Sequence, residues 1–160
     1  MGAPNFEWNK IPLLKKMDNK NLKIKIYDQK DKVFEGGFAL SIGNPHVIFF
    51  VDNLDDFNLK KIGPKIEKHN YFPENCNVTF ANIKNEKKII VKVWERGVGI
   101  TKACGTAACA TVVAASTLNL SDRCADIHFV EGSLNINWKP NNNIYMTGKV
   151  SKIKPIKISI

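Results

Sequence analysis

The sequence predicts an α+β domain in which a curved, mainly antiparallel sheet wraps around one buried central helix. The helix is predicted by residues 105–118, which carry no charge at any position and are almost all Ala, Cys, Val, Thr or Ser. The sheet is predicted by short strand-like segments, separated by turn residues, on both sides of this run. The small side chains of the run would let strands pack close to the helix.

The first part of the chain has the pattern of three strands. Apolar residues and lysines alternate over 22–27, which predicts a strand, and a second strand is expected over 33–42. Residues 43–46 then interrupt the β pattern, and the wholly apolar residues 47–51 have the composition of a buried strand. A loop with polar side chains is therefore expected between two strands.

The next segment predicts an amphipathic helix on the surface, capped by Asp55 or Asp56 and ending before residues 71–73. Its apolar positions, spaced three and four residues apart, are Leu59, Ile62 and Ile66. The remaining strand-like segments, each bounded by turn residues, are 77–83, 88–94, 125–130, 133–138, 144–150 and 152–160. The first two are expected to form a hairpin around residues 84–87.

Composition narrows the class of protein. The 160 residues are 44% apolar, which suits one domain with a substantial core. The net charge of +9 comes from 22 lysines that are spread along the chain and not gathered into a patch, so nucleic-acid binding is not expected. No run approaches the roughly 18–20 apolar residues of a membrane span, and no signal peptide is recognisable. No membrane contact and a cytoplasmic location are expected.

The four cysteines are expected to be reduced thiols. No Cys-x-x-Cys pair suggests a metal site, so none is predicted. On a helix that begins near Cys104, Cys109 lies about 140° around the axis from it. We expect Cys109, Cys76 and Cys124 to be packing residues.

One segment, from Glu95 to Thr106, places several residues of the types found in catalytic sites at the start of the predicted helix. Its two glycines within three residues mark a loop that bends sharply or approaches a ligand. Backbone N–H groups and the helix dipole at a helix start bind anions and lower the pKa of a thiol. Cys104 is therefore predicted to be partly thiolate and able to act as a base, with a substrate carboxylate on the N–H groups of Gly105 and Thr106.

Structural interpretations of this segment stay open. Cys104 could be a small buried residue beside a Gly-Thr helix cap, and Glu95 with Arg96 could form a surface ion pair. Arg96 is one of only two arginines in a chain with 22 lysines. This scarcity favours a site where the planar guanidinium makes two hydrogen bonds to one partner.

Four stretches, taken in order along nearly the whole chain, resemble the diaminopimelate epimerase family. They are Gly43-Asn44-Pro45-His46, Phe72-Pro73 with Asn77-Val78, the segment from Glu95 to Thr106, and Met146-Thr147-Gly148. The resemblance implies inversion of the α-carbon of LL-diaminopimelate to the meso form, in lysine and peptidoglycan synthesis, with no pyridoxal phosphate, metal or other cofactor. One cysteine removes the α-proton, and a second cysteine on the opposite face returns one.

By position, the resemblance implies that Cys104 is a catalytic cysteine and that His46 and Glu95 tune the thiols. It implies that the substrate is bound by Asn44, Asn77, Glu95, Arg96, Gly105 and Thr106. Some of these residues also have plainer interpretations. Asn44 before a proline could be a turn residue, a lone His46 is more often structural, and Asn77 could simply end a loop.

The family's N-terminal half carries the second cysteine in a Cys-Gly-Asn-Gly motif, which this sequence lacks. Residues 1–151 are expected to be the C-terminal epimerase domain. Residues 152–160 are expected to form a terminal strand that pairs with the N-terminal half, or with a second copy in a homodimer. The chain alone is expected to be inactive. A proline racemase-like isomerase and a non-catalytic amino-acid-binding half-domain are the alternatives.

Overall fold

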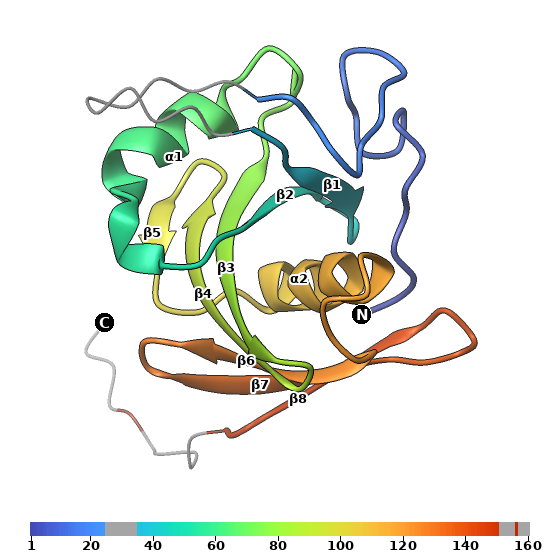
Figure 1. The fold of residues 1–160 in the computed structure, drawn as a ribbon, viewed down its shortest axis with the longest axis vertical. Coiled ribbons are helices and arrows are strands. Elements are labelled where there is room, and N and C mark those ends of the chain that lie inside the picture. The colour runs from blue at the N-terminus through green and yellow to red at the C-terminus, as the bar shows by residue number, and fades with distance from the viewer. Residues whose placement is uncertain (25–34, 151–155, 157–160) are drawn as a thin grey trace.

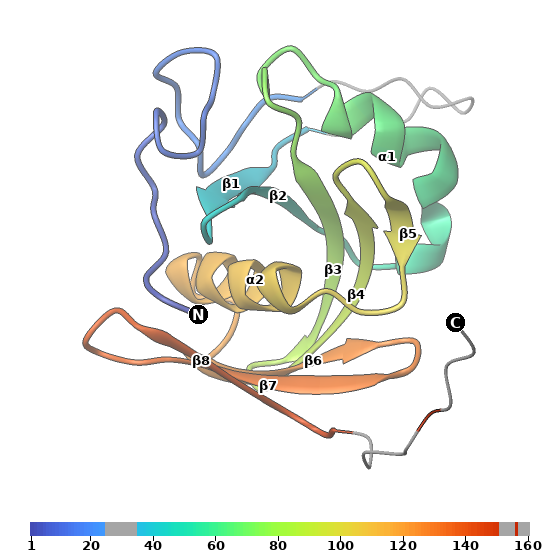
Figure 2. The ribbon, with the colours of Figure 1, turned by 180° about the vertical axis from the view of Figure 1, so that it is seen from behind.

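A computed structural model describes residues 1–24, 35–150 and 156, and its centre is one eight-stranded sheet (Figures 1 and 2). The strands are β1 (Phe38–Ser41), β2 (Pro45–Phe50), β3 (Asn77–Asn85), β4 (Lys88–Glu95), β5 (Gly99–Thr101), β6 (Cys124–Phe129), β7 (Gly132–Trp138) and β8 (Ile144–Gly148). They lie in the order β1-β2-β3-β4-β6-β7-β8, and β5 pairs with β4 beside this path.

Five of the seven strand pairings are antiparallel, so the mainly antiparallel sheet is confirmed. The predicted hairpin is present as β3 and β4. The pairings β2–β3 and β4–β6 are parallel, which the sequence pattern does not reveal. Because β2 and β3 run parallel, His46 and Asn77 lie side by side near the starts of these strands.

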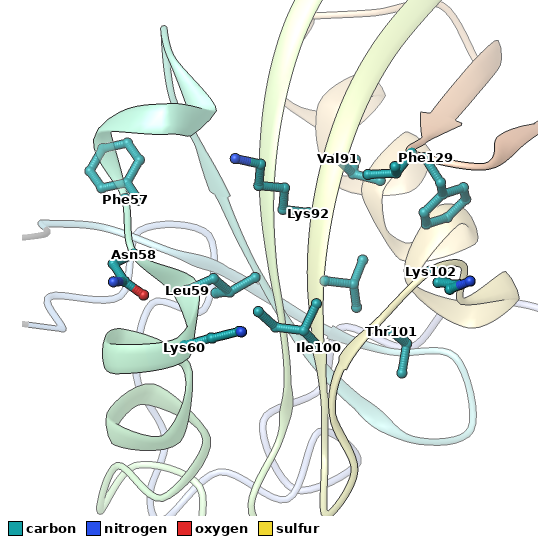
Figure 3. A pocket seen from close by; sticks show the side chains of 12 residues that line it. Phe57, Asn58, Leu59, Lys60, Val91, Lys92, Ile100, Thr101, Lys102 and Phe129 are labelled. Atoms are coloured by element: carbon teal, nitrogen blue, oxygen red, sulfur yellow. The ribbon is translucent and has the colours of Figure 1, made fainter.

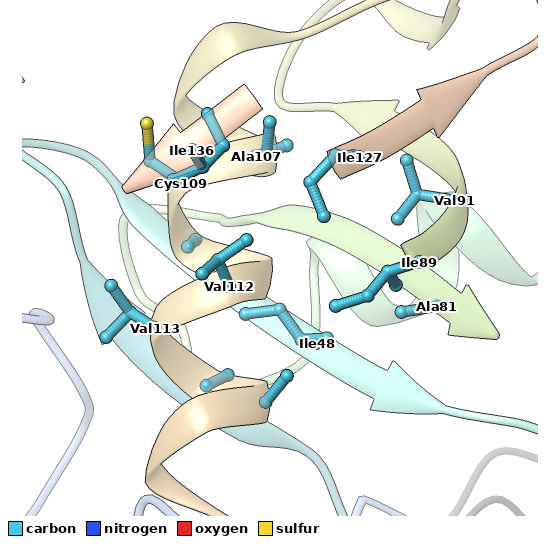
Figure 4. Close-up of a cluster of buried hydrophobic side chains, with 14 of the residues drawn as sticks. Ile48, Ala81, Ile89, Val91, Ala107, Cys109, Val112, Val113, Ile127 and Ile136 are labelled. Carbon is cyan, nitrogen blue, oxygen red and sulfur yellow. The ribbon is translucent and has the colours of Figure 1, made fainter. Parts of the chain in front are cut away.

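The uncharged run forms the helix α2 (Gly105–Thr117), and the sheet curls around it (Figure 2). A helix without a polar face is stable in water only when it is enclosed on all sides. Strands β1–β4 cover one side of α2 and strands β6–β8 the other, so the predicted central helix is confirmed. Figure 4 shows part of this core, including Ile48, Ile89, Val91, Val112, Val113, Ile127 and Ile136.

The helix α1 (Leu59–Glu67) packs on the opposite face of the sheet, over β3, β4 and β5 (Figure 1). Its lysines face solvent and its apolar side chains face Val78 and Phe80, so the amphipathic surface helix is confirmed. The predicted cap is wrong. Asp55 and Asp56 belong to a short 3₁₀ turn, η1 (Leu54–Asp56), and α1 begins only after Asn58.

The strand predicted over 22–27 is wrong in its described part. Leu22 and Ile24 are buried and Lys23 is exposed, as the alternation indicates. However, the N–H of Ile24 donates to the carbonyl of Leu22 at 3.0 Å, which is a tight turn and not a sheet ladder. Residues 25–34 lie outside the described residues, and the second predicted strand begins only at Phe38.

The terminal strand predicted over 152–160 lies outside the described residues, apart from Ile156, which is exposed and not in a strand. All four cysteines are free thiols. Cys76 and Cys109 are fully buried, as expected, but Cys124 is exposed, because β6 turns Ala125 and Ile127 inward and the residues between them outward. Within the described part of the chain, no helix has the length and apolar character needed to cross a membrane.

The contact between α1 and β4 yields a stability test. A Cβ atom on Gly63 would lie 2.6 Å from the ring of Trp94, which is too close for any real side chain. We predict that Gly63→Ala lowers the free energy of unfolding by about 1–3 kcal/mol, although alanine is the better helix former. Urea denaturation measures the change, with Lys60→Ala on the exposed face of α1 as the control. An equally stable Gly63→Ala protein would contradict this packing.

Candidate functional site

The predicted site residues lie at or beside the starts of β2 and β3, the end of β4 and the start of α2. Contacts link His46 to Asn44, Asn77 to Arg96, and Cys104 to Thr106, and the charge of Glu95 acts on Cys104. His46 and Asn77 are neighbours at the starts of β2 and β3, and β4 runs back antiparallel to β3 and ends at Glu95. The chain then turns through β5 and enters α2 after Cys104. Residues more than 50 positions apart in the sequence are thus held by rigid elements of one sheet and one helix.

The side chain of Asn77 ties two of these elements together. It is 4% exposed, its Nδ2 donates to the carbonyl of Pro45 at 2.9 Å, and its Oδ1 accepts from the N–H of Arg96 at 3.0 Å. Asn77 therefore links the start of β2 to the turn that follows β4. It does more than end a loop, and the bond to Pro45 uses one of the two N–H groups of its amide.

His46 is fully buried and contacts Asn44, with 3.0 Å between Nε2 and the Oδ1 atom of Asn44. Burial, assisted by the positive charge of Arg96, lowers the pKa of His46 to about 3. The ring is therefore neutral at pH 7, and Nε2–H is the donor in this bond. This bond holds the Asn44 side chain by its oxygen atom. The N–H groups of the Asn44 amide take no part in the bond to His46. A proton-transfer role for His46 itself is not supported by this pKa.

The turn after β4 requires both of its glycines. Gly97 and Gly99 have φ angles of 74° and 106°, in the region where side chains other than glycine are strained. The N–H of Val98 closes the turn by donating to the carbonyl of Glu95 at 3.1 Å. The guanidinium of Arg96 is exposed at the surface, where Nη1 donates to the carbonyl of Glu74 at 3.0 Å.

Glu67, at the end of α1, also belongs to this turn, and the sequence interpretation missed it. Its side chain is buried, with Oε1 accepting from the N–H of Gly97 at 2.9 Å and Oε2 accepting from Nε1 of Trp94 at 2.7 Å. A signal was present in the sequence, because Leu59, Gly63 and Glu67 are spaced four apart and so share the buried face of the helix.

Cys104 is the N-cap residue of α2, as the first turn of the helix begins at Gly105. Its side chain is buried, and Sγ lies 3.5 Å from Oγ1 of Thr106. The predicted lowering of its pKa is wrong: burial raises the pKa of the thiol, and the charge of Glu95 raises it further. The hydroxyl of Thr106 and the N–H of Ala107 act in the opposite direction, but burial is the larger effect.

The start of α2 has backbone N–H groups without a partner inside the helix. Its first N–H groups, including those of Gly105 and Thr106, have no carbonyl one turn earlier to bind. A Cβ atom on Gly105 would lie 3.0 Å from Sδ of Met146, so the side chain of this β8 residue packs closely against the start of α2.

Other features of the surface do not coincide with this site. A hollow of about 310 Å³ lies between α1, β4, β5 and the β6–β7 turn (Figure 3), with Leu59, Ile100 and Phe129 in its apolar wall and lysines at its rim. None of the predicted site residues lines it. Over residues 1–24, 35–150 and 156, no group of three or more His, Cys, Asp or Glu side chains is arranged to hold a metal ion.

Comparison with known proteins agrees with the motifs at this site. The family model described as diaminopimelate epimerase matches residues 38–153. A protein named diaminopimelate epimerase from Pelagibacter ubique is 54% identical over all 160 residues, and the match covers 58% of that protein. Proteins of the same name from Methylorubrum extorquens and a Wolbachia of Brugia malayi are 42% and 43% identical over 94% of the chain, which covers 51% and 56% of their lengths. The chain thus spans little more than half of these relatives.

The influence of Glu95 on the thiol can be measured. We predict that Glu95→Gln speeds alkylation of Cys104 by iodoacetamide at pH 8, because loss of the negative charge lowers the thiol pKa and raises the thiolate fraction. A shift of one pKa unit would give about a tenfold change in rate. Mass spectrometry of the Cys104 peptide gives the rate, with Cys124 as internal reference and Glu86→Gln as control. Slower alkylation of Glu95→Gln would contradict the effect.

Proposed function

Because the chain belongs to the diaminopimelate epimerase family, we propose that it supplies one catalytic cysteine and part of the substrate site of an enzyme that converts LL-diaminopimelate to meso-diaminopimelate in lysine biosynthesis. The observation that carries the proposal is the position of Cys104. It lies at an anion-binding helix start, between Thr106 and the carboxylate of Glu95. The proposed enzyme is cytoplasmic and acts without a cofactor.

Cys104 carries a proton at rest in this proposal, because its pKa is raised. A thiol is the form that donates, so Cys104 delivers a proton to the planar carbanion formed when the α-proton leaves from the other face. In the opposite direction of reaction the thiol must first lose its proton, and the nearby carboxylate of Glu95 is the group placed to accept it. His46 stays neutral and holds Asn44.

The reacting end of the substrate is an amino acid with an α-carboxylate. The N–H groups of Gly105 and Thr106 at the start of α2 would bind this carboxylate, which also holds the α-carbon near the Cys104 thiol. A carboxylate held by N–H donors stabilises the charge that develops when the α-proton is lost. Arg96 and Asn77 are joined by a hydrogen bond and Asn44 is held by His46, and these three side chains would contact the remaining polar groups of the substrate.

Inversion needs a second thiol on the opposite face of the carbanion. Of the described cysteines, Cys76 and Cys109 are fully buried, and Cys124 lies on β6, on the outer side of the sheet. The second thiol must therefore come from outside the described residues. We propose that an N-terminal half of the same enzyme supplies it, with residues 152–160 pairing with that half.

The proposal is tested with the chain combined with an N-terminal half taken from the Pelagibacter ubique relative. The combination is expected to epimerise LL-diaminopimelate, and the 160-residue chain alone is expected not to. Cys104→Ser should lower the rate by at least about 10³-fold, because a hydroxyl is a far weaker acid and base than a thiol. Chiral chromatography of the products measures the rate.

Cys124→Ser is the matched control, since it makes the same change at an exposed thiol, and it should keep full activity. Full activity of Cys104→Ser would place the proton carrier elsewhere. Turnover of proline in place of diaminopimelate would favour a racemase of the proline class. Binding of diaminopimelate without any inversion by the combined protein would favour a non-catalytic half-domain.

A further inference from the structure

We propose that Glu67 is a positioning residue that fixes the turn Glu95–Gly97 and thereby sets the place of Arg96 and Glu95 in the substrate site. This inference rests on the proposed function, because it assigns the turn a role in binding diaminopimelate. Glu67 itself lies behind the turn and would not contact the substrate.

The carboxylate of Glu67 is buried, and both of its oxygens accept hydrogen bonds. Only 5% of the residue is exposed, and each carboxylate oxygen accepts one N–H: Oε1 from Gly97 at 2.9 Å and Oε2 from the indole of Trp94 at 2.7 Å. Both donors belong to the end of β4 and the turn that follows, whereas Glu67 belongs to α1. The two bonds therefore fasten the turn to a different element.

A second buried side chain holds the same turn from the other side. Oδ1 of Asn77 in β3 accepts the N–H of Arg96, and Glu67 accepts the next N–H, that of Gly97. Two successive N–H groups are thus bound by side chains from β3 and α1. With both groups bound, the backbone at Arg96 has little freedom to rotate, so its side chain leaves the turn in one direction.

The choice of a carboxylate is informative. A buried charge costs free energy on desolvation, and an apolar side chain of similar size often serves stability as well or better. A carboxylate accepts two N–H groups at once with both oxygens, whereas a glutamine amide offers only one oxygen.

The test compares Glu67→Gln with Glu86→Gln, which makes the same change in the exposed β3–β4 turn. Glutamine keeps the size of the side chain but presents an N–H₂ group to one of the two donors. Two readouts are taken: hydrogen exchange of the Gly97 amide by NMR on the 160-residue chain, and kcat and KM for LL-diaminopimelate after addition of the N-terminal half.

Glu67→Gln is expected to speed exchange of the Gly97 amide by at least about tenfold and to lower kcat/KM by at least about tenfold, chiefly through a higher KM, since a bond to a charged group is lost. Glu86→Gln should leave both values unchanged. A purely structural role would lower the melting temperature but leave KM unchanged in the folded protein. A KM within twofold of that of the unchanged chain, about the scatter expected for such a comparison, would therefore overturn the proposal.

Two further outcomes remain informative. If Glu67→Gln does not fold, Trp94→Phe removes one of the two donors to Glu67. This variant should raise KM and speed Gly97 exchange to a smaller degree, and no change in either would overturn the proposal.

If the unsubstituted combined protein has no epimerase activity, the proposed function fails and the substrate role given to the turn fails with it. The exchange of the Gly97 amide then still reports whether Glu67 fixes the turn.

Discussion

Burial of the uncharged helix α2 is the constraint on which the rest of the structure depends. With Ala, Val, Cys and Thr on every side, α2 has no face that can be left in water, so one sheet has to curl around it. The sheet places the starts of β2 and β3 beside the end of β4, where the charge of Glu95 acts on Cys104 at the start of the helix. The same burial that stabilises the fold therefore creates the place where the polar residues of the candidate site meet.

Burial also decides the chemistry of the thiol. A helix N-terminus favours a thiolate, and the N–H of Ala107 and the hydroxyl of Thr106 do act in that direction on Cys104. The enclosed setting of Cys104 and the charge of Glu95 outweigh them. A protonated cysteine beside a carboxylate suits the proposed function, in which Cys104 gives a proton in one direction of the reaction and takes one in the other.

Much of this could be predicted from the sequence because it depends on local pattern. The uncharged run predicts α2, the alternation predicts the β3–β4 hairpin, and the Gly-rich segment predicts a sharp bend before Cys104. Features that depend on distant contacts could not be predicted. The two parallel pairings, the raised thiol pKa and the bonds of Glu67 to the turn all arise from elements that meet only in three dimensions.

In the proposed reaction, Cys104 and a thiol from an N-terminal half exchange the α-proton from opposite faces of the substrate. The most direct test of this reaction is the isotope content of both isomers early in a reaction of LL-diaminopimelate in D₂O. The first meso product is expected to carry deuterium at the inverted carbon while the remaining LL substrate is unlabelled, because the incoming proton comes from a different thiol. Labelling of the LL substrate as fast as the product would mean that one base serves both faces, and it would contradict the two-thiol reaction.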